Sequence, residues 1–205
     1  MDNLEQMLTT SLGARRIPIN LIPESCCETS ILPVIDFDAV KIAFCGKKHL
    51  HLLAQLRSAD CLHIDEKRNA ICFIEMKNMQ NFINSTITRY DNYAAYMAAF
   101  DNWLQIKTVE LREKIVDSIF ITVSAVGRYN SYTTDLARIL NRKDVEISYM
   151  VLTNIDNEQY LEYGIGSLER KIQYPLLAGP LFSAFTILTS DFDDFIANRI
   201  GTLKG

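Results

Sequence analysis

The chain has 205 residues, of which 48% are hydrophobic and 22% are charged, and its formal net charge is −4. This composition excludes a disordered or fibrous protein, because such chains lack the apolar residues that a packed core requires. The length suits one core and no Gly/Ser/Pro-rich linker divides it, so we expect a single domain over residues 1–205.

Two stretches are informative about the cellular location of the protein: the N-terminus and an apolar segment near the C-terminus. Met1–Glu5 is acidic and has neither the basic start nor the long apolar run of a secretory signal. Leu176–Leu188 is too short to span a bilayer and contains Gly179-Pro180. The five cysteines form no C-x-x-C pair, which is typical of reduced, buried thiols. We therefore expect a soluble cytoplasmic protein that does not bind a membrane.

The first quarter of the chain predicts a helix, an irregular segment and a strand. Residues 2–12 carry apolar side chains at helical spacing, and glycine follows them. Residues 14–38 contain three of the five prolines, so we expect irregular structure with a helical turn near residues 24–31. Ala39–Phe44 is apolar enough for a first strand, and residues 47–57 would connect it onward as a helix or loop.

The next segment predicts a β-hairpin. Ala59–Asp65 and Ala70–Lys77 are rich in strand-forming residues, and the polar residues 66–69 between them favour a turn. If the turn is centred on that link, the pairing is symmetric and Asp60 lies opposite Glu75. Directly opposed residues have Cβ atoms about 4.5–5.5 Å apart, so two carboxylates would be within reach of one ion.

The predicted hairpin places three ionisable side chains on one face. Asp60, Glu75 and Lys77 share that face because side chains alternate along a strand. Two opposed carboxylates on an apolar face are unfavourable unless a cation neutralises them. Oxygen ligands suit Mg²⁺ or Mn²⁺ better than Zn²⁺. An ordinary structural ion pair between Glu75 and Lys77 explains the spacing equally well.

Residues 78–117 form a long segment that contains neither glycine nor proline. Apolar residues recur there at helical spacing, which predicts one long helix or two helices with a break near Gln105–Thr108. Its aromatic residues would serve the core or a subunit contact rather than stack on bases. They are Tyr90, Tyr93, Tyr96, Phe100 and Trp103.

The remaining elements predict a mixed sheet. Ile119–Val126 is a continuous apolar run that favours a buried central strand, Thr133–Asn141 a helix, and Val145–Thr153 a second buried strand. A strand, helix, strand succession implies parallel pairing, in contrast to the antiparallel hairpin. Phe182–Leu188 predicts a further strand and Asp191–Ile200 a closing helix.

The hairpin residues and the element order together resemble the PD-(D/E)XK nuclease superfamily. Asp60, a gap of fourteen residues and then Glu75-Met76-Lys77 match its signature, although Ala59 stands where the family name has proline. The resemblance covers roughly residues 39–153 and implies a restriction-endonuclease-like α/β fold with an α-β-β-β-α-β core. Residues 1–38 and 154–205 would then be additions to that core.

The same resemblance implies roles for the three hairpin residues. Asp60 and Glu75 would hold a catalytic Mg²⁺ or Mn²⁺, and Lys77 would position the attacking water and stabilise charge on the phosphate. Glu28 or Glu5 could supply a further acid from before the sheet, and Gln80 and Arg89 could line the site from the following helix. Nothing in the sequence selects between Glu28 and Glu5, and a solvated surface position explains each of them better.

Charge distribution favours a nucleic-acid substrate. Residues 41–90 contain eight Lys/Arg against four Asp/Glu, although the whole chain is acidic. A basic segment around a carboxylate pair suits a phosphodiester, because the phosphates need neutralising while the metal needs anions. The candidate contacts are Lys47, Lys48 and Arg57, which an ordinary solvated surface explains equally well.

The sequence thus predicts a Mg²⁺-dependent endonuclease or exonuclease acting on DNA. Such an enzyme needs restraint, so we expect a homo-oligomer or the effector subunit of a prokaryotic antiviral-defence complex, by analogy with other small nucleases. The alternative is a non-catalytic interaction subunit that retains a nuclease-like scaffold and binds through its aromatic helix.

Overall fold

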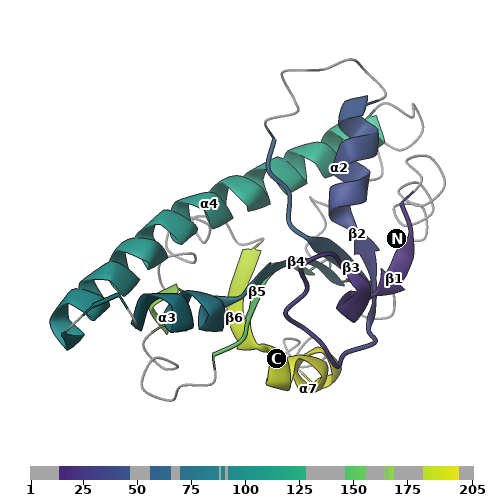
Figure 1. Cartoon of the computed structure of the whole chain (residues 1–205). Helices are drawn as coiled ribbons and strands as arrows, with labels where there is room; N and C mark the ends of the chain where they lie inside the picture. The colour runs from purple at the N-terminus through teal and green to yellow at the C-terminus, as the bar shows by residue number, and fades with distance from the viewer. Residues whose placement is uncertain are drawn as a thin grey trace.

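The computed structural model describes residues 14–46, 56–65, 70–87, 89–90, 92–127, 146–155, 164, 166–168 and 182–198. Its described strands form one six-stranded sheet in the order β1-β2-β3-β4-β5-β6 (Figure 1). Strands β1 to β4 pair antiparallel, whereas β4, β5 and β6 pair parallel, so the predicted mixed α/β sheet is confirmed. The strands are β1 (Arg16–Pro18), β2 (Pro33–Asp36), β3 (Cys61–Asp65), β4 (Ala70–Lys77), β5 (Glu146–Thr153) and β6 (Phe182–Leu188).

Helices lie on both sides of this sheet. Figure 1 shows α4 running diagonally across one side, with α3 near its N-terminal end and α2 near its C-terminal end. Helix α7 lies on the other side. The helices are α2 (Phe37–Gly46), α3 (Met79–Ile87), α4 (Tyr93–Gly127) and α7 (Phe192–Asn198), and two short 3₁₀ helices are η2 (Ile19–Leu21) and η4 (Thr189–Asp191).

Each face of the sheet has its own apolar core. Leu62 and Phe73 of the hairpin pack with α4 on one side, whereas Cys61 and Ile74 pack with η2 and α7 on the other. Strand pairing places Leu62 opposite Phe73 and Asp65 opposite Ala70, so the predicted symmetric register is confirmed. A shift by one residue would have exchanged the two faces.

The expected strand Ala39–Phe44 is wrong, because these residues belong to α2. The Asp36 carboxylate accepts a hydrogen bond from the Ala39 N–H at 2.9 Å, which caps the start of the helix. Phe37, Val40 and Phe44 are buried at helical spacing. The neighbouring strand is instead β2, within the segment 14–38 that we expected to be irregular.

The expected central strand Ile119–Val126 is also wrong, because it forms the C-terminal part of α4. The hydroxyls of Ser118 and Thr122 donate to backbone carbonyls four residues earlier, as in a helix. Phe120 is 46% exposed, whereas the neighbouring Ile121 is fully buried, so one face of this helical run is exposed to solvent. The parallel partner of β5 is therefore β4.

The helical segment after the hairpin divides at a different place than expected. The break lies between Ile87 and Tyr93 rather than near Gln105–Thr108. The Thr108 hydroxyl donates to the Leu104 carbonyl inside an unbroken helix.

Several other predictions have clear outcomes. The strands at Val145–Thr153 and Phe182–Leu188 are confirmed as β5 and β6, and the closing helix as α7. The helices expected at 2–12 and 133–141 lie outside the described residues. Within the part of the chain that the structure describes, no helix combines the length and the apolar character needed to cross a membrane.

Candidate functional site

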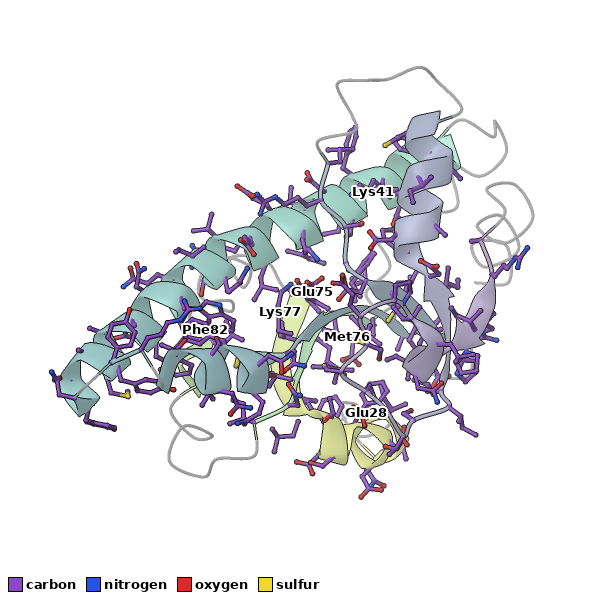
Figure 2. All side chains as sticks on the ribbon, viewed as in Figure 1. Glu28, Lys41, Glu75, Met76, Lys77 and Phe82 are labelled. Carbon is purple, nitrogen blue, oxygen red and sulfur yellow. The ribbon has the colours of Figure 1, made fainter. Side chains whose placement is uncertain are left out.

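Asp60, Glu75 and Lys77 meet on the side of the sheet that faces α4. Asp60 directly precedes β3, and Glu75 and Lys77 lie near the C-terminal end of β4. The Lys77 ammonium lies 2.5 Å from Glu75 Oε1. Figure 2 shows Glu75 and Lys77 between β4 and α4. The hairpin register therefore brings together the side chains that the sequence predicted to share a face.

Lys114 of α4 joins this group from above the sheet. Its Nζ lies 2.6 Å from Glu75 Oε1 and 3.3 Å from Asp60 Oδ1. The second Asp60 oxygen accepts a hydrogen bond of 2.6 Å from the Met76 N–H. The site thus holds two carboxylates and two ammonium groups, which we call the ionic cluster: Asp60, Glu75, Lys77 and Lys114.

Burial differs sharply within the ionic cluster. The Glu75 side chain is 0% exposed, whereas Asp60, Lys77 and Lys114 are each about one-fifth exposed, at 19%, 18% and 20%. Glu75 is therefore the most deeply buried member of the cluster, and the other three groups are partly exposed to solvent.

Backbone contacts fix the approach of Asp60 to α4. The Ala59 N–H donates to Ser118 Oγ at 2.8 Å, and this hydroxyl donates to the Lys114 carbonyl at 2.7 Å. The Asp60 carbonyl accepts a hydrogen bond from the Phe37 N–H at the start of α2. The segment before β3 is therefore tied to both helices, and Ser118 connects it to the turn that carries Lys114.

Burial and charge shift the pKa values of the cluster. Burial and, after it, the Asp60 charge raise the pKa of Glu75 while Lys77 and Lys114 lower it, and the net result is a pKa of about 7. Burial lowers the pKa of Lys114, but the Glu75 and Asp60 carboxylates outweigh it and the net pKa is raised. Burial, with Glu75 and Asp60 nearby, raises the pKa of Tyr149 well above its usual value.

The donor set of the ionic cluster fits a hard divalent cation. Glu75 Oε2 is buried and accepts no hydrogen bond, so one hard oxygen remains available for a ligand. Mg²⁺ commonly takes one or two carboxylates and keeps several waters. Within the described residues, no group of three or more His, Cys, Asp and Glu side chains gathers. The fit therefore rests on Asp60 and Glu75 alone.

Further unpaired hydroxyls lie on the same side of β5 and β6. Thr153 pairs in register with Lys77, and Thr186 with Val151, which in turn pairs with Glu75. The hydroxyls of Tyr149, Thr153 and Thr186 are buried and make no hydrogen bond. Sequence reasoning identified none of these polar groups, because each stands within a run that otherwise indicates a buried apolar strand.

The other predicted site residues lie elsewhere or outside the described part of the chain. Figure 2 shows Glu28 beside α7, away from Glu75, and its side chain is exposed. The Gln80 side chain donates to Asn84 Oδ1, and its backbone N–H donates to the Asn154 carbonyl. Arg89 is exposed. Lys47, Lys48 and Glu5 lie outside the described residues.

Arg57 is a surface residue rather than part of the cluster. Its Nε lies 3.3 Å from Glu113 Oε2, and both side chains are about half exposed, at 46% and 53%. The Arg57 N–H donates to the Asp117 carboxylate at 2.8 Å. This arginine therefore ties the chain before β3 to α4, one turn from Lys114.

The aromatic residues of α4 divide between core and surface. Phe100 is fully buried, and Trp103 stacks on Phe82 with ring centroids 4.7 Å apart. Tyr96 is also buried, whereas Tyr93 at the start of the helix is 57% exposed. The prediction of a core role is confirmed for the buried members.

Lys114 is the residue of this site that the sequence interpretation missed. It stands in a charged stretch with Arg112 and Glu113, and such a stretch is typical of the solvated side of a helix. One available signal was its place beside Leu111 and Ile115, which are both fully buried. That signal places Lys114 next to the apolar side of the predicted helix, but it does not indicate which residues of the sheet the lysine reaches.

Comparisons of the chain with protein-family models, with curated proteins and with solved structures found no match. What the ionic cluster can do therefore follows from its own atoms and from the elements that position them.

Proposed function

We propose that this chain is a divalent-metal-dependent nuclease that hydrolyses phosphodiester bonds in DNA. The observation that carries the proposal is the meeting of Asp60, Glu75 and Lys77 on one face of the sheet, with Glu75 fully buried. Burying a carboxylate costs free energy unless another group or an ion neutralises its charge. Ionisable groups with strongly shifted pKa values concentrate at functional sites.

The topology supports a restriction-endonuclease-like arrangement as part of this proposal. Three antiparallel strands, β2 to β4, are followed by helices and then by β5 parallel to β4. The acids come from the β3–β4 hairpin at the middle of the sheet. A rigid central hairpin is a suitable support for groups that must hold fixed positions.

The residues of the cluster would divide the work of hydrolysis. Asp60 and Glu75 would hold Mg²⁺, which when bound supplies charge neutralisation at the phosphate and activation of a water. Lys77 would orient the water and stabilise negative charge that develops on the phosphate. Helix α4 covers the buried side of Glu75 and limits its access to bulk water.

A gel assay of DNA cleavage tests this function. Purified protein is incubated with plasmid and with single-stranded DNA or RNA, in Mg²⁺ or in EDTA. We expect Mg²⁺-dependent loss of DNA, and a decrease in rate of about 100-fold or more in Glu75→Gln and Lys77→Met. Lys107→Met is the matched control, because Lys107 pairs with Glu110 on the same helix, 2.7 Å away. A folded Lys77→Met variant with the wild-type rate would overturn the proposal.

One observation favours a non-catalytic interaction subunit as the second candidate. Lys77 and Lys114 both contact Glu75 Oε1, so two ammonium groups balance two carboxylates without any ion. A cluster of this kind can be purely structural. Binding of DNA that stays uncleaved in the presence of Mg²⁺ and of Mn²⁺ supports this candidate over the nuclease. Binding of a protein partner without any DNA cleavage under the same conditions supports it as well.

A further inference from the structure

We infer that Lys114 is an internal competitor of the divalent cation: its ammonium and the ion exchange at the oxygens of Asp60 and Glu75, and the released Lys114 then binds the substrate phosphate. This inference rests on the proposed function and assigns to Lys114 a regulatory role in the same site.

The contacts of Lys114 are those of a bridging cation. Its Nζ contacts oxygens of two carboxylates, 2.6 Å from Glu75 of β4 and 3.3 Å from Asp60, the residue before β3. Lys77, by contrast, contacts Glu75 Oε1 only, among the described ion pairs. Of the two lysines, Lys114 is therefore the one that contacts both of the carboxylates that would hold a metal ion.

Charge repulsion makes the two occupants exclude each other. An ammonium and a divalent ion held by the carboxylates of Asp60 and Glu75 would lie within a few ångströms of each other, where water screens their repulsion poorly. Binding of the ion to Asp60 and Glu75 is therefore an exchange with Lys114 rather than an addition.

The surroundings of Lys114 allow the side chain to leave while the helix stays. Its backbone carbonyl accepts a hydrogen bond from Ser118 Oγ, which also accepts one from the Ala59 N–H. The side chain is 20% exposed and its four-carbon chain is flexible, so its ammonium can turn toward solvent. The backbone anchor and the movable amine are thus separate.

The exchange changes the charge that a substrate meets. The ionic cluster carries two negative and two positive formal charges, so its sum is zero. A divalent ion at the two carboxylates would bring the sum over the ion, the carboxylates and both ammonium groups to two positive charges. A phosphodiester is an anion, so we expect substrate affinity to depend on the ion even where no cleavage occurs.

Calorimetry with Mn²⁺ alone tests the competition. On the full chain, Lys114→Met should bind Mn²⁺ about tenfold more tightly than the wild type, because the competing charge is gone. Lys114→Arg keeps the charge and should stay near the wild-type affinity. Lys107→Met, on the same helix and paired with Glu110, is the control and should leave the affinity unchanged.

Binding of labelled duplex DNA in Ca²⁺ provides the second measurement, by fluorescence anisotropy. Ca²⁺ should strengthen DNA binding by the wild type, and strengthen it less in Lys114→Met, which lacks the released ammonium. If Lys114→Met does not fold, the alternative measurement is the NMR spectrum of the wild-type protein with ¹³C-methylated lysines. The signal that Lys114→Arg removes should move on addition of Mg²⁺, and the Lys107 signal should not.

The outcomes separate this inference from the proposed function. Unchanged or weaker Mn²⁺ binding by Lys114→Met, with clear binding by the wild type, overturns the competition and leaves the metal site intact. A Lys114 signal that Mg²⁺ does not move overturns it as well. Absence of Mn²⁺ binding by both wild type and Lys114→Met overturns the proposed metal site itself.

Discussion

At the scale of single residues, Glu75 combines complete burial with strong ion pairing. Its side chain is 0% exposed, yet two ammonium groups lie within 2.6 Å of its Oε1. Burial is the largest cause of its raised pKa, and the nearby Asp60 charge adds to it. The residue is therefore most easily accommodated when protonated or when a cation shares its charge.

The raised pKa of Glu75 predicts a pH-dependent stability in EDTA. The ordinary pKa is 4.5 and the folded one is about 7, so the folded state binds more protons than the unfolded state between these values. Stability from this group is full below pH 4.5 and is lost as the pH rises through 7. The contribution amounts to about 3 kcal/mol. We expect Glu75→Gln to gain stability relative to wild type between pH 5 and pH 8, as measured by urea unfolding.

Glu110 is a control with the opposite sign on the same helix as Lys114. Burial acts to raise its pKa, but the hydrogen bond and charge of Lys107 outweigh that effect and lower it. Stability from Glu110 is present above its unfolded pKa and is lost as the pH falls, so Glu110→Gln should not gain on wild type at high pH. Parallel pH profiles of wild type and Glu75→Gln would contradict the assignment to Glu75.

At the scale of elements, Ser118 is the contact through which α4 positions the segment before β3, which contains Asp60. Its hydroxyl is fully buried, accepts from the Ala59 N–H and donates to the Lys114 carbonyl. Ser118→Ala would leave the Ala59 N–H buried without a partner. We expect the free energy of unfolding to fall by about 1–3 kcal/mol, measured by urea denaturation.

Ser85→Ala is the matched control for Ser118→Ala. Ser85 lies on α3, is exposed, and donates to the Phe82 carbonyl within its own helix. Its replacement should change the free energy of unfolding by less than about 0.5 kcal/mol. Equal losses in both variants would show that Ser118 does not link α4 to the hairpin.

The hairpin was predictable from the sequence because several local signals agree. Two runs with strand composition flank a polar link, and a symmetric register buries apolar residues on both faces, as β3 and β4 do. The carboxylate pair followed from that register alone. Local pattern sufficed here because strands that adjoin in sequence also adjoin in space.

Two apolar runs were misread because composition does not separate a buried strand from a partly buried helix. Ala39–Phe44 is short enough for either, and the deciding signal is the helix cap supplied by Asp36. Ile119–Val126 is rich in β-branched residues, yet it continues a helix already 26 residues long. Tertiary packing against the sheet outweighs its local preference for extended structure.

The missing part of the site depends on the path of α4 across the sheet. The sequence placed Lys114 in a predicted helix over residues 78–117, but it did not indicate which strand that helix crosses. With α4 continuing to Gly127, Lys114 lies beside the buried stripe and reaches the carboxylates. A contact between residues 39 positions apart depends on the path of the whole helix, which no local pattern specifies.

At the scale of the whole molecule, the two faces of the sheet have different chemistry. The face under α4 carries the ionic cluster and the unpaired hydroxyls of β5 and β6. The opposite face holds four of the five cysteines, packed with η2 and α7. Cysteine is a small apolar residue in such a core, so this face is a structural support and the α4 face carries the polar groups.

This asymmetry predicts the thiol reactivity of the folded protein. Burial is the largest cause of the raised pKa values of Cys26, Cys27, Cys61 and Cys72, to about 11 for Cys26 and about 12 for Cys72. Cys45 of α2 is only partly buried. A disulfide reagent such as DTNB at pH 8 should therefore label one thiol quickly, because the thiolate is the reactive form and requires access.

The reaction also distinguishes local opening from global unfolding. Cys45→Ser should remove the fast phase, while the four thiols of the opposite face react at the rate at which the folded state opens and all five react at once in urea. Because Cys61 and Cys72 lie on the two strands of the hairpin that holds the ionic cluster, their protection reports directly on that hairpin. Rapid labelling of either one in the native protein would show that the hairpin opens on its own, and a site built on it would lose the fixed geometry that catalysis requires.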